Sequence, residues 1–518
     1  MMTPTDRAPE GLLLEARIVS LRSLIAAIDA NIESVRLRSL LPADPRAILI
    51  GLGIDPRAAE RLEGELPLTI LSFDRGASTE RAVGVRLDGA GIARLRRALP
   101  FEAVDGIHRL EGSSPAPLFL VGDRLIMARS AAFALELAPY LAREMTEEDD
   151  GDDEDAGETI LRLCLRSPAQ LAGLRELLDR AVERRMDALR AAMMARRAAL
   201  PDEPALGDPE AAIDSLERRL RLALSLSAHL KTVEMTMRAH EGSATFRILF
   251  EANEGSELDA IFNNEAGKER EGGLGKILAR GAAGAGFGIA FYGDRALNQL
   301  LLTAGGEQIS GAERARIEAL FSREGAEDRA RFIAARAIGG AGELLILREG
   351  EDAERLKRAI EARSSYLRAL MIRIAGCDAE GAPGSGGRGE LCRGEGARTR
   401  LEAAGDALYL RTARPSSDSA GRLGKITPEL ARLFSAIDDQ ASLAIYLEGE
   451  RLLPSLALSS RRVELAILGA RASPPRPAFI TYQARSGGGE LRIALAPSSI
   501  DRLLRALLTL RNAEDHAP

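Results

Sequence analysis

The residues that could do chemistry begin with a glycine-rich stretch, EGGLGKILARGAAGAGFGIAFYGD, over positions 271–294. A phosphate-binding P-loop here would need a glycine where Arg270 stands and a hydroxyl group where Ile277 stands. A dinucleotide fingerprint beginning at Gly284 would need a third glycine at Ile289 and a strand before the loop. The pattern therefore predicts no cofactor. It indicates a connector whose small residues let two backbones approach before the next strand.

Hydrolytic and metal-dependent chemistry has little more support. The chain has no G-x-S-x-G motif, and His240-Glu241 begins like a zinc-protease motif but has Ala244 at the second histidine position. The acidic run EEDDGDDEDAGE, residues 147–158, fails the calcium-loop spacing because Asp155 stands where the turn glycine belongs. We predict no catalytic residue and no metal ligand. A hydrolase that uses unassigned carboxylates is kept as an alternative, because the chain has 77 acidic residues.

Three cysteines complete the reactive side chains. Cys164 lies in the strand-like run TILRLCLR and is expected to pack in a sheet. Cys377 and Cys392 bracket the segment DAEGAPGSGGRGEL, which is rich in glycine, so the two could close a loop as a disulfide or stand as two thiols. A disulfide would indicate an oxidising compartment.

An apolar stripe is the one candidate ligand surface. Apolar and polar residues alternate through two segments around the turn at His240, which is typical of half-buried antiparallel strands. The apolar members could line a cavity for a lipid-like molecule, or they could form an ordinary closed core. They are Val233, Met235, Met237, Phe246, Ile248 and Phe250.

Composition excludes several classes of protein. A net charge of -7 and an aromatic content of 4% argue against nucleic-acid binding, because neither a basic surface nor a stacking platform is available. The chain has no apolar run of about 18 residues, so no integral membrane segment is expected. The first 30 residues lack the pattern of a secretory leader, which would make the protein cytoplasmic if this sequence is the full precursor.

The elements that position these residues follow a recurring order, a strand hairpin and then a helix. Examples are APLFLVGDRLIMARS before SAAFALELAPYLAREM, and AFITYQARSGGGELRIALA before SSIDRLLRALLTLR. A different element begins at Pro168, where capping residues predict a long helix that ends at about Ala199. A second helix is predicted from Pro209 to about His229, and the two helices should pack as a hairpin. We therefore expect an α+β fold of duplicated antiparallel sheet domains built from hairpin-helix units, with a helical hairpin inserted between the halves.

The expected domains follow from these elements and from two linkers. They are an N-terminal α+β domain (1–146), an acidic linker (147–158), a strand with the helical hairpin (159–229), a second α+β region (230–375), a glycine-rich linker loop (376–398) and a C-terminal α+β region (399–518).

Three segments of the sequence resemble known proteins. They are PADPRAILIGLGI, FLVGDRLIMARSAAFALELAPYLAREM and LKTVEMTMRAHEGSATFRILFEANEGSELDAIF. In the way strand-like and helix-like segments follow one another, the chain resembles uncharacterised cell-envelope proteins of bacteria. Those proteins are predicted to be secreted or lipid-anchored and to contain repeated domains of strands and helices. The resemblance implies a periplasmic or outer-envelope location and no known activity. We therefore expect a non-catalytic binding or scaffold protein with a protein partner. The alternative is a carrier of an apolar small molecule, and the oligomeric state is left open.

Overall fold

The computed structural model divides the chain into two compact units, Met1–Ala260 and Ile261–Pro518, and each is described by itself. The described residues are 9–31, 44–62, 66–74, 79–113, 116–142, 158–165, 168–199, 217, 220, 221, 224, 227–240, 243–266, 274, 275, 278, 285–292, 330–338, 341–348, 390–394, 397–404, 407–413, 431, 434, 437, 440–449 and 476–502.

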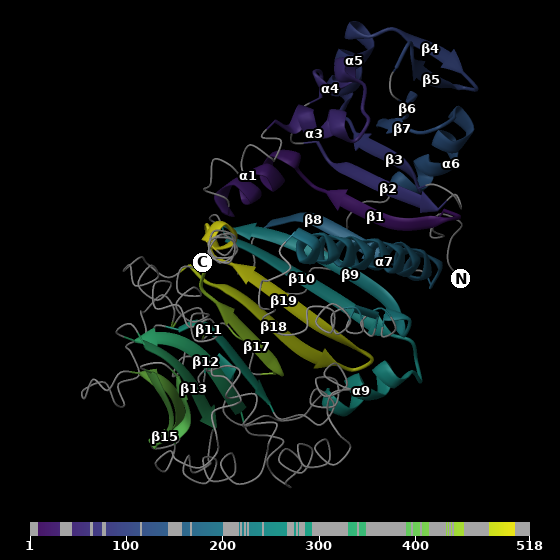
Figure 1. The fold of residues 1–518 in the computed structure, drawn as a ribbon. Helices are drawn as coiled ribbons and strands as arrows, with labels where there is room; N and C mark the ends of the chain where they lie inside the picture. The colour runs from purple at the N-terminus through teal and green to yellow at the C-terminus, as the bar shows by residue number, and fades with distance from the viewer. Residues whose placement is uncertain are drawn as a thin grey trace. The chain divides into compact units, whose positions relative to one another are not determined.

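The first unit is built on an antiparallel sheet of ten described strands (Figure 1). Their order across the sheet is β4-β5-β6-β7-β3-β2-β1-β8-β9-β10, and every neighbouring pair is antiparallel. The strands are β1 (Leu12–Ile18), β2 (Leu68–Asp74), β3 (Thr79–Arg86), β4 (Phe101–Val104), β5 (Ile107–Leu110), β6 (Leu118–Val121), β7 (Arg124–Met127), β8 (Glu158–Leu165), β9 (Leu230–His240) and β10 (Ser243–Ala252).

Helices cover both faces of this sheet. The helices are α1 (Leu21–Asn31), α3 (Pro45–Gly51), α4 (Pro56–Ala59), α5 (Gly89–Ala98), α6 (Ala131–Leu141) and α7 (Pro168–Ala199). One apolar core joins residues of α1, α3, α4 and α5 to the strands, and a second core joins α6 to the other face. In that second core the rings of Phe73 and Phe133 meet edge to face at 5.2 Å. Over β2, β3, β6 and β7 each face is closed, because the strand residues there are apolar and a helix supplies the facing side chains.

The second unit has nine described strands, again all antiparallel, in the order β19-β18-β17-β11-β12-β13-β16-β15-β14. They are β11 (Ala285–Tyr292), β12 (Ala330–Ile338), β13 (Ala341–Arg348), β14 (Glu390–Gly394), β15 (Ala397–Ala404), β16 (Ala407–Ala413), β17 (Leu443–Leu447), β18 (Ala478–Arg485) and β19 (Gly488–Leu495). Its described core contains three aromatic rings in mutual contact, those of Phe434, Tyr446 and Phe479. The helix α9 (Glu257–Glu265) contains the boundary between the units.

The mixed α+β class is confirmed: large antiparallel sheets with several helices form the structure. The long helix is also found, since α7 spans Pro168–Ala199. It lies inside the first unit, between β8 and β9, and not between the halves as the sequence predicts. The physical reason is that β9, which follows the helix, pairs with β8, and β10 pairs with β9, in the first sheet. The finer domain boundaries stay predictions.

The glycine-rich stretch contains a close backbone approach. A Cβ atom added at Gly275 would lie 2.2 Å from the carbonyl oxygen of Phe434, which is closer than any side chain can come. Both residues are helical and buried. This contact agrees with the reading of the stretch as a place where two backbones approach.

Candidate functional site

The helix α7 starts from a fixed position on the first sheet. Pro168 occupies its first turn, where a missing N–H group costs nothing. Gln170 is buried, and a Cβ atom at Gly173 would lie 2.2 Å from a methyl carbon of Leu13 in β1. Glycine at position 173 therefore lets the first turns of α7 lie tightly against the sheet.

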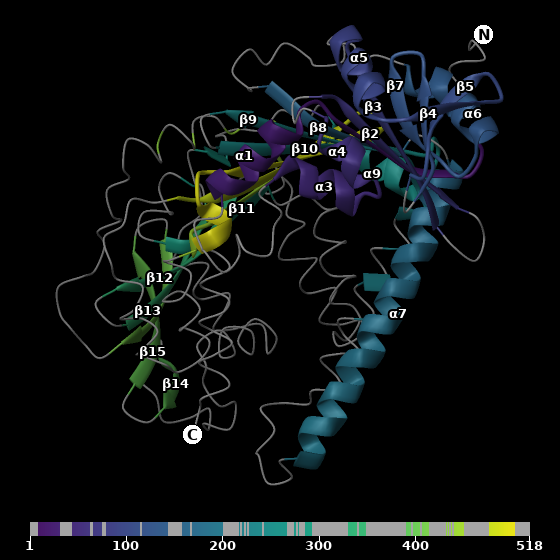
Figure 2. The same cartoon turned by 90° about the horizontal axis from the view of Figure 1, so that it is seen from above.

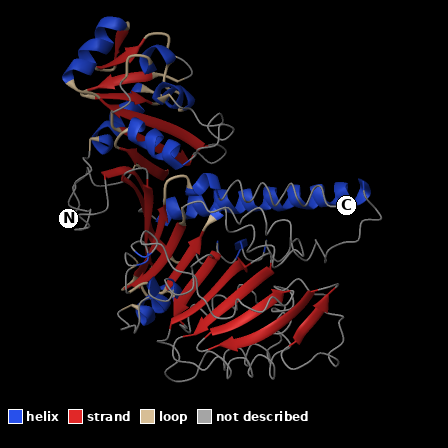
Figure 3. Cartoon of the chain, turned by 90° about the vertical axis from the view of Figure 1, so that its left-hand side faces the viewer, coloured by secondary structure: helices blue, strands red, loops and turns tan. Residues whose placement is uncertain are grey.

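Beyond these turns, α7 extends away from the sheet of its own unit (Figures 2 and 3). Its 32 residues correspond to about 48 Å of helix at 1.5 Å per residue. Along this length Leu178 is 45% exposed and Met194, near the far end, is 65% exposed. Single exposed apolar side chains are common on protein surfaces, so the exposure of these two residues does not by itself mark a binding surface.

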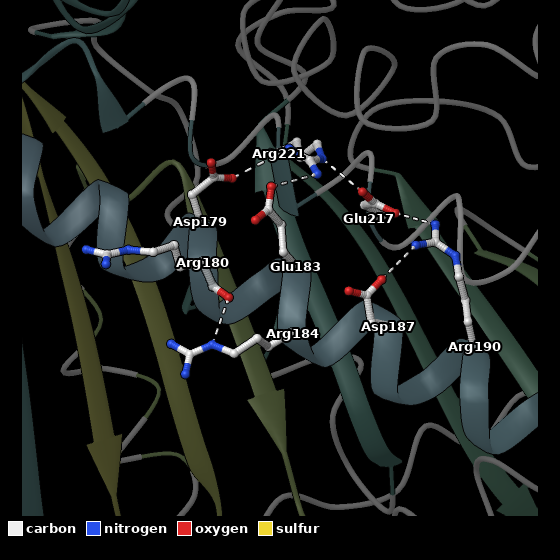
Figure 4. Close-up of polar contacts among 8 residues, drawn as sticks. All are labelled: Asp179, Arg180, Glu183, Arg184, Asp187, Arg190, Glu217 and Arg221. Atoms are coloured by element: carbon white, nitrogen blue, oxygen red, sulfur yellow. Dashed lines mark hydrogen bonds and ion pairs between the residues drawn. The ribbon is translucent and has the colours of Figure 1, made fainter. Parts of the chain in front are cut away.

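A network of ion pairs ties α7 to a second helical segment (Figure 4). Arg190 Nη2 lies 2.5 Å from Glu217 Oε2, and Arg221 Nε donates to Glu217 Oε1 at 2.9 Å. The guanidinium of Arg221 also lies 3.6 Å from Asp179 and 3.7 Å from Glu183. Residue 217 therefore meets the later part of α7 and residue 221 the earlier part. We call α7 together with the described residues Glu217, Leu220, Arg221 and Leu224 the helical arm; the second helix of the predicted hairpin stays a prediction.

The electrostatics of the helical arm follow from these contacts. Hydrogen bonds from Arg190 and then from Arg221 lower the pKa of Glu217. The hydrogen bond to Glu217 raises the pKa of Arg221. The pairs are partly or fully exposed to solvent, so salt screens them and the individual contribution of each to stability is small. Together the pairs fix the register of one segment against the other.

The six residues of the predicted apolar stripe are brought together on one face of the first sheet. Three pairs lie directly opposite each other across β9 and β10: Met237 with Phe246, Met235 with Ile248, and Val233 with Phe250. On the other side of β9, the same rows continue into β8 with Leu161, Leu163 and Leu165. The result is a grid of three rows on three strands.

The grid faces α1, which packs against β8 and β10. Met237 is buried, whereas the other five residues of the stripe are only half-buried. The grid is therefore not fully closed off from solvent, although α1 packs on it. That the stripe lines a ligand site stays a prediction.

The opposite face of β1, β8 and β9 is polar and partly buried. Tyr140 of α6 donates to Glu15 Oε2 at 2.6 Å, and Arg17 Nε donates to Glu15 Oε1 at 2.5 Å. In the next rows Arg162 Nε lies 2.6 Å from Glu234 Oε1. Both carboxylates are thus held by neighbouring donors. Sequence reasoning missed this network, because Glu15 and Tyr140 stand 125 positions apart and no local pattern links them.

A second buried polar network lies in the second unit. Glu448 is 1% exposed, accepts from the backbone N–H of Arg476 at 2.6 Å, and lies 3.9 Å from Arg502. The guanidinium of Arg476 donates to Ser498 Oγ at 2.8 Å. Ser498 has φ +61, a backbone conformation that serine rarely adopts. These contacts join three separate segments of the chain and hold the start of the helix that follows Ser498.

The predicted cysteine pair lies mostly outside the described residues. Cys377 is not described, and Cys392 lies in β14, where only the backbone is described. The disulfide therefore stays a prediction. Cys164 is buried in β8, as expected.

Among the residues that the structure describes, no group of three or more His, Cys, Asp or Glu side chains could hold a metal ion. Within the same residues, no helix has the length and apolar character to cross a bilayer.

Comparison with known proteins identifies no family. No family profile matches the chain, and no curated protein sequence matches it. Among solved structures, the chain has a distant likeness to one described as crystal form IV of TP0453. That match has 10% sequence identity, covers 46% of this chain and 77% of the other, and has a TM-score of 0.21. A likeness of that size carries no functional argument, so the function must be argued from the described residues themselves.

Proposed function

We propose that this chain is a non-catalytic binding or scaffold protein and that the helical arm is its main contact surface. The observation that carries the proposal is the geometry of α7: a helix anchored at Gly173, cross-linked by ion pairs to residues 217 and 221, and exposed at Met194. A helix pair braced in this way loses little conformational freedom when a partner binds, which favours affinity. The partner expected is another protein.

Photo-cross-linking in the native cell tests this role. A photoreactive amino acid is placed at Met194 on the arm, and at Ile50 in α3 as a control, because Ile50 is also an exposed apolar residue at 42%. The proposal expects a discrete cross-linked product from position 194 and none of comparable yield from position 50. Equal yields at both positions, or no product from position 194, would contradict it.

We also propose a cell-envelope location, in the periplasm or at the outer envelope, because the sequence resembles uncharacterised cell-envelope proteins of bacteria. A disulfide between Cys377 and Cys392 would support this location. Mass measurement after thiol alkylation without reductant separates the alternatives, since a bridged pair takes up no alkyl groups. Two alkylated residues, together with recovery of the protein in the cytoplasmic fraction, would count against export.

A second candidate function is a carrier of an apolar small molecule, with the ligand between α1 and the grid on β8, β9 and β10. The half-buried state of Met235 and Ile248 supports it, because a fully closed core would bury both. Native mass spectrometry of freshly purified protein provides the test. A copurifying lipid favours the carrier, whereas a clean mass of the chain alone counts against it.

We further infer that the two units arose by duplication. Counted from its own first strand, the first unit has the order 4-5-6-7-3-2-1-8-9-10. When β11 is counted as strand 1 of the second unit, its order is 4-5-6-3-2-1-7-8-9. The two orders become the same if the first unit contains one additional strand next to its third strand, which is β7. After the last strand of each unit a serine is followed three residues later by an aspartate, Ser256 with Asp259 and Ser498 with Asp501. An experimental structure whose sheets fail to superpose strand by strand would refute this inference.

A further inference from the structure

We propose that the second unit has an apolar-ligand site of its own, on a face of its sheet that carries a row of isoleucines. The occupant is one uncharged apolar molecule, such as a neutral lipid. This inference rests on the second candidate function, the carrier, and extends it from one site to two. It does not depend on the role of the helical arm.

Six neighbouring strands of the second sheet each place an isoleucine at the same level (Figure 1). The strands are β13, β12, β11, β17, β18 and β19, and each isoleucine lies directly opposite the next. In that order they are Ile346, Ile333, Ile289, Ile445, Ile480 and Ile493. Residues directly opposite each other share a face of the sheet. We call this set the isoleucine row.

On β17, β18 and β19 the rows on either side of the isoleucine row are also without charge. They are Leu447, Ala478 and Leu495 on one side, and Leu443, Tyr482 and Leu491 on the other. With the isoleucines, these residues make three rows on three strands. Such a face has no charged group to recognise a charged ligand, so it suits an uncharged apolar molecule.

The two faces of these strands differ in how far they are closed. On one face Tyr446 is 0% exposed and Phe479 is 5% exposed, and their rings contact that of Phe434, which is 1% exposed. On the other face Ile445 and Ile480 are half-buried. Along β17 buried and half-buried residues alternate without exception. The same strands therefore have one closed face and one face that is incompletely closed.

The degree of burial distinguishes between kinds of occupant. A closed core would bury the isoleucines as fully as it buries Tyr446, because protein interiors are densely packed. A surface that docks another protein would expose large apolar side chains. The four side chains of the row that the structure describes are all half-buried, at Ile289, Ile445, Ile480 and Ile493. A face that is screened from solvent but not filled suits a small apolar molecule.

The first unit has the same arrangement at corresponding positions. The hairpins β9–β10 and β18–β19 both have two-residue turns, so they can be aligned by counting from the turn. The middle row of the grid, Leu163, Met235 and Ile248, then corresponds to Ile445, Ile480 and Ile493. All six residues are apolar and half-buried, although only one residue type is shared. The incompletely closed apolar face is thus a property of both units, and a ligand at one predicts a ligand at the other.

Counting bound ligands on the full-length protein tests this inference. The probe is Nile red, an uncharged apolar dye whose fluorescence rises when it leaves water, and we expect the wild type to bind two equivalents. Ile445→Thr/Ile480→Thr keeps β-branched side chains but adds hydroxyl groups, and should weaken one equivalent by about tenfold or more. Leu163→Thr/Met235→Thr should weaken the other. Leu135→Thr removes an exposed apolar side chain on α6 and should leave both unchanged.

The outcomes separate this inference from the carrier function. Binding that is weakened only by the substitutions in the first unit would overturn the second site and leave the carrier standing. Binding that is weakened only by Ile445→Thr/Ile480→Thr would support the second site and count against the grid. Absence of dye binding by the wild type would contradict both. Circular dichroism checks that each variant is folded. If Ile445→Thr/Ile480→Thr is not, Ile493→Trp replaces it, because a larger apolar side chain should displace the same equivalent by filling the space.

Discussion

Replacing one glycine with alanine at two sites should change stability in opposite directions. At Gly275 a Cβ atom would lie 2.2 Å from the carbonyl oxygen and 3.2 Å from the carbonyl carbon of Phe434, whereas distances below 3.0 Å are essentially never seen. That carbonyl cannot yield easily. It accepts from Ile437 N at 3.2 Å, and the Phe434 ring is packed 5.4 Å from that of Phe479.

The magnitude follows from two opposing terms. Overpacking a close contact costs about 1–3 kcal/mol, while alanine in place of glycine in a helix gains at most about 1 kcal/mol. A contact of 2.2 Å with a backbone carbonyl places the cost at the upper end of its range, so we expect Gly275→Ala to destabilise the second unit by about 2 kcal/mol, the difference between about 3 and about 1 kcal/mol. Gly51 in α3 has no atom within 4 Å of the added Cβ, so Gly51→Ala should stabilise the first unit by a few tenths of a kcal/mol up to about 1 kcal/mol.

Hydrogen exchange measured by mass spectrometry suits this comparison, because the two units need not unfold together. Faster exchange in β17 and β18 is expected for Gly275→Ala, and unchanged or slower exchange in the first unit for Gly51→Ala. If Gly275→Ala left exchange in the second unit unchanged, the close approach of the two helices would be refuted.

Three further predictions concern the polar networks. Tyr140→Phe removes a buried hydrogen bond to the Glu15 carboxylate and should lower the free energy of unfolding of the first unit by about 1.5–3 kcal/mol, measured by hydrogen exchange in β1. Glu448→Ala leaves Arg476 N and Arg502 without their acceptor and should cost the second unit about 3 kcal/mol, measured in the same way. The lowered pKa of Glu217 means that its pairing is present above the ordinary pKa of a glutamate and is lost as the pH falls through the lower folded value. A pair of fluorescent labels on the helical arm should separate only in that acidic range, and separation near neutral pH would contradict the prediction.

The sequence predicts much of the local structure, because local patterns determine it. Alternation of apolar and polar residues identifies β9 and β10, and their register then places all six stripe residues on one face. The capping residues at Ser167 and Pro168 predict the start of α7, and Ser256 caps α9 by accepting from Asp259 N at 3.1 Å. Such signals are short in range, so a single sequence carries them.

What could not be predicted depends on contacts distant in the chain. The strand β1 has no local signal, because LLLEARI does not alternate between apolar and polar residues. It is buried on both faces in the middle of the sheet, between β2 and β8.

The central claim, that the helical arm contacts a partner, is tested most directly by its accessibility in the native state. Met194→Cys on the arm and Leu135→Cys on α6, at 65% and 40% exposure, are compared for their rate of reaction with a bulky maleimide, resolved by peptide mass spectrometry. The claim predicts that position 194 reacts quickly in the purified protein and much more slowly in freshly opened cells, while position 135 reacts equally in both. Equal rates at position 194 in the two preparations would contradict it.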